Sequence, residues 1–170
     1  MYKRQIEEYK KLFYELKSKI KNVSITTDII VGFPNETEED FQKTLDIYNE
    51  LKYDLAYTFI YSPREGTPAS KMEDSVPLEE KEERLQRLNK IVNKYAKEAN
   101  EKYLGKTVPV LLEGYSDKGG KLMGYTDTMK LVNVAADPSL IGQIKNVLIT
   151  DVKTWSMDCL LYTSDAADEL

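Results

Sequence analysis

The stretch Thr26–Phe41 constrains the fold of this chain more than any other part of its sequence. It begins as a run of β-branched and apolar residues, which predicts a buried strand. The run breaks at Gly32–Pro34, where a glycine and a proline favour a turn. The pattern resumes as a helix, with Thr37 as N-cap and Asp40 closing a capping box. A strand that ends in a glycine turn before a helix is typical of α/β proteins, which bind small ligands at this edge of a parallel sheet.

The segments around this stretch continue the alternation of helix and strand up to residue 104. Periodicity predicts helices at residues 6–21, 37–51 and 78–104 and strands at residues 24–31 and 54–61. The first helix is amphipathic and is expected to bury one stripe, made of Ile6, Tyr9, Leu12, Phe13, Leu16 and Ile20. The third helix is dense in Lys and Glu opposite its apolar stripe, which indicates a solvated face. The order of elements predicts two parallel strands side by side.

From Lys106 onward the pattern changes to short β-rich segments separated by Gly, Asp and Pro turns. Strands are expected at residues 107–113, 121–128, 131–135 and 144–155, which favours a small β-barrel or sandwich. We therefore place a domain boundary near Gly105. Trp155, at the end of the last expected strand, is interpreted as a core residue rather than as a base-stacking platform.

The two ends of the chain, residues 1–5 and 159–170, match no periodic pattern and resemble in-frame translations of sequencing-adapter DNA. We expect residues 6–158 to be the natural segment, and a piece of a longer gene. That segment contains neither cysteine nor histidine, so we assign it no catalytic residue and no metal ligand. No apolar run approaches the roughly 20 residues that a membrane-spanning helix needs, which predicts a soluble segment. Its expected location is the cytoplasm.

Charge gives little support for a nucleic-acid partner. The chain has a formal net charge of −5, residues 6–104 carry 16 basic and 20 acidic side chains, and residues 105–158 carry six of each. Neither region is a strongly basic surface, so any RNA binding would depend on local clusters.

Five segments in order resemble the radical S-adenosylmethionine tRNA methylthiotransferases: residues 26–34, 59–64, 66–69, 83–88 and 137–142. The resemblance covers nearly all of residues 6–158. It implies an α/β plus all-β fold: the C-terminal part of a radical SAM partial (βα) barrel at residues 6–104, then a TRAM domain, a small OB-like β-barrel, at residues 105–158. The family's N-terminal methylthiotransferase domain and its CxxxCxxC cluster motif are absent from these residues.

The resemblance also implies cofactors, S-adenosylmethionine and two [4Fe-4S] clusters, in the parent protein. The positions matching the family's S-adenosylmethionine edge are Ile30, Gly32, Phe33, Pro34, Glu36 and Tyr61. The broader pattern GxIxGxxE is met loosely, because Asp28 replaces its first glycine and Glu36 lies one place late. Asp28, a carboxylate within an apolar strand, is expected to face the barrel lumen or to pair with an Arg or Lys.

Four residues are candidates for contact with substrate RNA: Arg64, Tyr125, Lys130 and Asn133. Tyrosine can stack on bases, and Lys or Arg can contact phosphate. Asp127 stands where many relatives have arginine, which weakens this interpretation for the strand around it.

The function implied is a transferase that inserts a methylthio group at carbon 2 of isopentenyl-adenosine beside the tRNA anticodon. The chain alone is expected to be inactive, because the cluster ligands and the N-terminal domain lie outside it, and its expected partner is tRNA, with no membrane. Two alternatives stay open: a fragment of a methylthiotransferase that modifies a ribosomal protein, and a non-catalytic tRNA-binding module.

Overall fold

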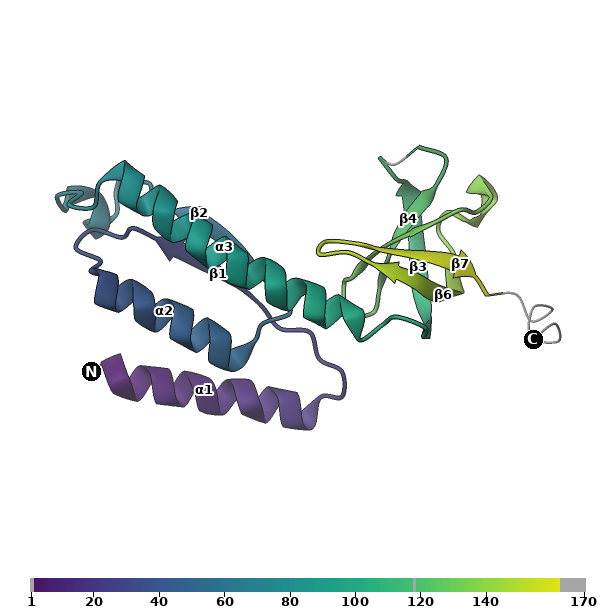
Figure 1. The fold of residues 1–170 in the computed structure, drawn as a ribbon, viewed down its shortest axis with the longest axis horizontal. Coiled ribbons are helices and arrows are strands. Elements are labelled where there is room, and N and C mark those ends of the chain that lie inside the picture. Colours follow the sequence, from purple (N-terminus) through teal and green to yellow (C-terminus); the bar gives the residue numbers. More distant parts are fainter. Residues whose placement is uncertain (1, 118, 163–170) are drawn as a thin grey trace. The chain divides into compact units, whose positions relative to one another are not determined.

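The computed structural model describes residues 2–117 and 119–162 (Figure 1). The chain divides between Tyr95 and Ala96 into two compact units, and one helix, α3 (Leu78–Glu101), runs across that division. Within the described residues, no helix is long and apolar enough to cross a membrane.

The N-terminal unit has the predicted alternation of helix and strand. Its elements are α1 (Tyr2–Lys19), β1 (Thr26–Val31), α2 (Glu38–Leu51), β2 (Leu55–Ile60), the 3₁₀ helix η1 (Pro68–Lys71) and most of α3. β1 and β2 pair in parallel, which confirms the predicted βαβ unit. Helix α2 begins with the predicted capping box, in which the Thr37 side chain accepts from the Asp40 backbone and Asp40 accepts from the Thr37 backbone.

One face of this two-stranded sheet is covered by the core, and the other is open. Val31 and Ala56 pack with apolar residues of all three helices, among them Phe13, Phe41 and Leu88. On the opposite face the strand partners Ile30 and Phe59 are 56% and 51% exposed. Alternation along a strand places Asp28 on this same open face, and it is exposed. Asp28 thus lies on the face opposite the helices, and the expectation that it faces the barrel lumen or pairs with an Arg or Lys stays a prediction.

Helix α1 forms as predicted, but its apolar stripe is mostly exposed. Of the six residues expected to be buried only Phe13 is, at 4% exposure, and Leu12 is 55% exposed. Phe13 packs edge-on against Tyr53, with ring centroids 5.4 Å apart, and the Tyr9 hydroxyl lies 2.7 Å from that of Tyr53. Ion pairs of Lys10 with Glu50 and of Lys17 with Asp54 also attach the helix to its unit. The periodicity that predicted the helix could not show which of its residues have a partner.

The C-terminal unit contains a closed five-stranded barrel. Its elements are β3 (Thr107–Tyr115), β4 (Leu122–Thr126), β5 (Leu131–Val134), the 3₁₀ helix η2 (Pro138–Leu140), β6 (Ile144–Val152) and β7 (Met157–Leu161). The strand order is β3-β4-β5-β7-β6, and only β5 and β7 are parallel. The inward side chains of all five strands form one buried cluster, which confirms the predicted small barrel.

The barrel differs from the sequence prediction at its C-terminal end. The segment expected to be one strand, residues 144–155, ends at Val152, and a turn leads into a further strand, β7. Cys159 to Leu161, in the terminal segment that matched no pattern, belong to β7, and the Cys159 side chain is 5% exposed. At the other end of the chain, α1 includes residues 2–5. Residues 163–170 lie outside the described residues.

Candidate functional site

The carboxyl ends of β1 and β2 meet, and the structure brings the predicted cofactor residues together there. The Tyr61 backbone N–H donates to the Val31 carbonyl at 2.8 Å, so the loops that follow the two strands start side by side. The rings of Phe33 and Tyr61 pack edge to face, with centroids 5.1 Å apart. Phe33 is 44% exposed, whereas Pro34 is buried. The edge therefore presents an apolar surface on a fixed loop.

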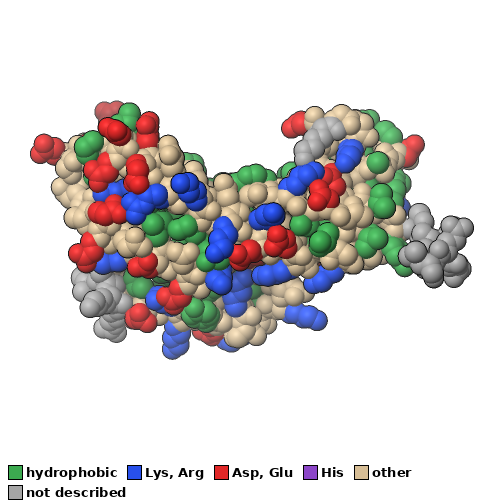
Figure 2. Space-filling view, viewed as in Figure 1, with side chains coloured by type: hydrophobic (Ala, Val, Ile, Leu, Met, Phe, Trp, Pro, Cys, Tyr) green, Lys and Arg blue, Asp and Glu red, His purple; other side chains and the backbone are tan. Residues whose placement is uncertain are grey.

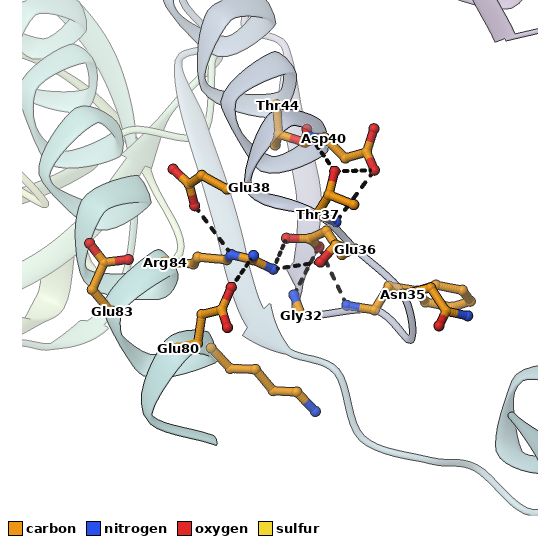
Figure 3. A network of polar contacts seen from close by, with 12 residues as sticks. Gly32, Asn35, Glu36, Thr37, Glu38, Asp40, Thr44, Glu80, Glu83 and Arg84 are labelled. Atoms are coloured by element: carbon orange, nitrogen blue, oxygen red, sulfur yellow. Dashed lines mark hydrogen bonds and ion pairs between the residues drawn. The ribbon is translucent and has the colours of Figure 1, made fainter. Parts of the chain in front are cut away.

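Glu36 holds this loop in shape (Figure 3). One carboxylate oxygen accepts from the backbone N–H of Gly32 at 2.9 Å and of Phe33 at 3.4 Å. The other oxygen accepts from the Arg84 guanidinium at 3.1 Å. Both carboxylate oxygens of Glu36 already have partners within the protein, so its hydrogen bonds stabilise the conformation of the loop.

Arg84, from α3, is the buried centre of this network, and sequence analysis missed it. Its side chain is 1% exposed and forms ion pairs with Glu36, Glu38 and Glu80. It also donates to the Glu36 carbonyl, and its guanidinium lies 5.7 Å from the centre of the Phe41 ring. The interpretation of the charged residues of α3 as a solvated face is wrong at this position. A signal was present, because Arg84 lies one helical turn before Leu88 on the apolar stripe.

Lys81 is the second buried cation of α3, again contrary to the expected solvated face. It is 3% exposed, its ammonium contacts Asp74 at 2.6 Å, and it lies 5.7 Å from the centre of the Tyr61 ring. The methylenes of Lys81 fill the space beside Gly32, where an added Cβ would lie 2.3 Å from Cγ. The missing side chain of Gly32 therefore makes room for Lys81.

Replacing Gly32 with alanine is expected to destabilise the N-terminal unit by about 2–3 kcal/mol. The residue has a φ of +71°, which strains any L side chain, and its Cβ would overlap Lys81. Gly66→Ala is the matched control, since Gly66 has a φ of +84° but open space around it. Urea unfolding should show a loss of about 1 kcal/mol for Gly66→Ala. Equal losses for the two variants would contradict a packing role for Lys81.

Tyr61 and Arg64 also lie at this edge, on the segment that follows β2. The Tyr61 hydroxyl is buried and has no hydrogen-bond partner among the residues described, which leaves a donor available for a bound group. Arg64 is exposed in the loop after β2, where its carbonyl accepts from the Thr67 backbone and hydroxyl. In the described part of the chain, no group of three or more His, Cys, Asp or Glu side chains could hold a metal ion.

In the barrel, the three predicted RNA contacts lie near one another but differ in accessibility. Tyr125 in β4 is half-buried, and Lys130 closes the turn after β4, where its carbonyl accepts from the Thr126 N–H. Asn133 in β5 is 3% exposed, and its side-chain oxygen accepts from the Ser116 hydroxyl at 2.7 Å. Tyr125 and Lys130 can therefore be reached from solvent, and Asn133 cannot without a local rearrangement.

Trp155 is 55% exposed in the turn between β6 and β7. The prediction that it belongs to the core is wrong. Apolar residues of the strands themselves fill the barrel, and the turn lies outside the cluster that they form.

Comparison with known proteins agrees with this architecture. The family model of the TRAM domain matches residues 101–158, so the barrel unit is a TRAM domain. Over 153 residues, 89% of this chain, the sequence is 55% identical to the tRNA-2-methylthio-N(6)-dimethylallyladenosine synthase of Bacillus mycoides (strain KBAB4). Identity to the synthases of Bacillus thuringiensis (strain Al Hakam) and Bacillus cytotoxicus is 56% and 54% over the same length. The chain is thus similar to these synthases over most of its own length, and it spans 30% of the length of the relatives it matches.

Proposed function

We propose that this chain is part of an enzyme that inserts a methylthio group at carbon 2 of isopentenyl-adenosine beside the anticodon of tRNA. The observation that carries the proposal is the single alignment of 153 residues at 55% identity, which includes both units. Because the relatives are named for a product in tRNA, a tRNA substrate is favoured over a ribosomal protein. A tRNA substrate would also place the enzyme in the cytoplasm.

The N-terminal unit would be the C-terminal part of a radical SAM partial barrel. Its parallel strands have an open face that exposes Ile30, Tyr57 and Phe59, and α1 exposes most of its apolar stripe. Large apolar surfaces of this kind are expected where further elements of a longer chain pack. The ligands of the two [4Fe-4S] clusters would belong to such elements, outside these 170 residues.

The edge after β1 and β2 would contribute one side of the S-adenosylmethionine site. Ile30 and Phe33 offer apolar contact area, and the Tyr61 hydroxyl offers an unpaired donor. Gly32, Pro34 and Glu36 would act by fixing the loop, because their contacts are within the protein. These residues fit an adenosine-containing cofactor, which would supply the radical when bound together with a cluster. Arg64 would contact a carboxylate or a phosphate from the exposed loop after β2.

A chimaera tests the proposal. Residues 6–158 would replace the matched region of the Bacillus mycoides synthase, and methylthiolated nucleoside would be measured by mass spectrometry of tRNA from cells that lack the native enzyme. We expect the modification to be restored. A chimaera that folds and holds its iron–sulfur clusters but leaves tRNA unmodified would contradict the proposal. The isolated 170-residue chain, reconstituted with iron and sulfide, is the control and is expected to show no cluster absorbance.

The non-catalytic alternative is that the barrel serves only as a tRNA-binding module. It is favoured by one observation, the TRAM match confined to residues 101–158. A second variant of the chimaera distinguishes the enzyme from the binding module. If the barrel served only to bind tRNA, any other tRNA-binding domain could replace it. An unrelated RNA-binding domain fused in place of residues 101–158 is therefore expected to fail.

A further inference from the structure

Two turns of the barrel are held by Asn100, near the C-terminal end of α3, and by Tyr103, two residues after that helix. The Asn100 side-chain amide donates to the carbonyls of Lys153 at 2.8 Å and Thr154 at 3.1 Å, in the turn between β6 and β7. The Tyr103 hydroxyl lies 2.6 Å from the Thr128 hydroxyl oxygen, in the turn between β4 and β5. Asn100 is 4% exposed, so its two hydrogen bonds to the β6–β7 turn are shielded from water. The two turns are thereby fixed to the same segment of the chain.

The strand pairing places these turns next to each other. β5 and β7 run parallel, and Val132 pairs with Met157. Lys130 directly precedes β5 and Trp155 lies two residues before β7, so both turns lead into the same parallel pair of strands. The Lys153 N–H donates to the Ser156 carbonyl at 2.9 Å and closes the β6–β7 turn tightly around Trp155.

Large apolar side chains are exposed on both turns. Trp155 is 55% exposed and Met129 is 71% exposed. Burial of an indole side chain is among the most favourable in free energy. An exposed tryptophan on a turn held by hydrogen bonds therefore indicates a binding partner. The surface charge of this region does not favour a strong electrostatic attraction to a partner. Acidic and basic side chains are interspersed on the face seen in Figure 2, and they are equal in number over residues 105–158. Contact with a polyanion through this unit would depend on stacking more than on long-range attraction.

We infer that Trp155 is a base-stacking contact for an unpaired nucleotide of the RNA substrate, with Lys130 beside it on the next turn. The inference rests on the proposed tRNA function and adds a residue to it. A clamped indole offers a preformed stacking face, and base stacking on an aromatic side chain does not depend on which base it is.

The chain itself provides the probe, because Trp155 is its only tryptophan. Titration of the 170-residue chain with an unmodified tRNA transcript is expected to quench the intrinsic tryptophan fluorescence. Affinity would be measured by the anisotropy of labelled RNA at fixed salt. Trp155→Ala is expected to weaken binding about 5- to 100-fold, and Trp155→Phe, which keeps an aromatic face, much less. A single-stranded oligonucleotide should show the same loss, and a fully paired RNA duplex should not.

Tyr115→Ala is the matched control, because Tyr115 is 68% exposed but lies where β3 pairs with the start of β4, at the opposite end of the barrel. It is expected to bind RNA as the unmodified chain does. Suppose that the unmodified chain binds RNA. If Trp155→Ala then bound with equal affinity, or if Tyr115→Ala lost as much affinity as Trp155→Ala, the inference would be overturned and the proposed function would stand. Failure of the unmodified chain to bind any tRNA would contradict the RNA-binding part of the proposed function, and the inference with it.

Discussion

Replacing Arg84 with alanine is expected to destabilise the N-terminal unit by about 3–5 kcal/mol. The guanidinium is 1% exposed and lies between α3 and the loop after β1, where it pairs with Glu36 and Glu80 (Figure 3). Its removal leaves the Glu36 carboxylate, whose side chain is 13% exposed, without its cation. Glu38 and Glu80 are 56% and 45% exposed and can be hydrated instead, which favours the lower end of this range.

The loop should respond more than the rest of the chain. Glu36 would still accept from the backbone of Gly32 and Phe33, but nothing would hold Glu36 against α3. Hydrogen exchange should therefore rise at residues 31–41 and along α2, while the barrel keeps its protection. A similar rise in both units would show that Arg84 does not act locally.

Arg87→Ala provides the control, because Arg87 lies three residues, almost one helical turn, after Arg84 in α3. Arg87 is 33% exposed and pairs with Glu38 and Glu83, and its hydrogen bond to Glu38 lowers the pKa of that carboxyl. An ion pair as accessible as this contributes about 0–1 kcal/mol, so urea unfolding should barely change. A loss for Arg87→Ala as large as that for Arg84→Ala would mean that burial is not the cause.

The sequence predicted the local structure well where a motif or a period determines it. The capping box at Thr37 and Asp40 was correct in both hydrogen bonds, because both partners lie within four residues. The parallel pairing of β1 and β2 followed from one helix between two apolar runs. The grouping of Gly32, Phe33 and Tyr61 at one edge followed from that pairing, since parallel strands end on the same side.

The errors concern burial, which depends on distant partners. Most of the α1 stripe is exposed, because periodicity identifies a face and not what covers it. Arg84 is buried, because three glutamates from two segments surround it; its place on the apolar stripe of α3 indicates burial but not these partners. Trp155 is exposed, because the expected single strand is broken by a turn at that residue.

Replacing Gly124 with alanine is expected to destabilise the barrel by about 3 kcal/mol or more. Gly124 lies in β4 opposite Leu112, and a Cβ there would lie 2.1 Å from the Leu111 carbonyl oxygen and 2.8 Å from its carbon. Overpacking costs about 1–3 kcal/mol when side chains can move aside. Here the obstacle is the backbone of the neighbouring strand, so the pairing of β3 with β4 must shift and the closed barrel must distort.

Cys159, the only cysteine of the chain, reports on this change from the other side of the barrel. It is 5% exposed in β7, and burial raises the pKa of its thiol to about 12, so the native barrel should react slowly with thiol reagents. Labelling in moderate urea should become at least about 100-fold faster in Gly124→Ala, which corresponds to about 3 kcal/mol when labelling requires opening of the barrel. Gly114→Ala is the matched control, because Gly114 lies in the paired strand β3 and an added Cβ meets nothing within 4 Å. If both variants were labelled at the same rate, the close approach of β4 to the Leu111 carbonyl would not be what requires glycine at position 124.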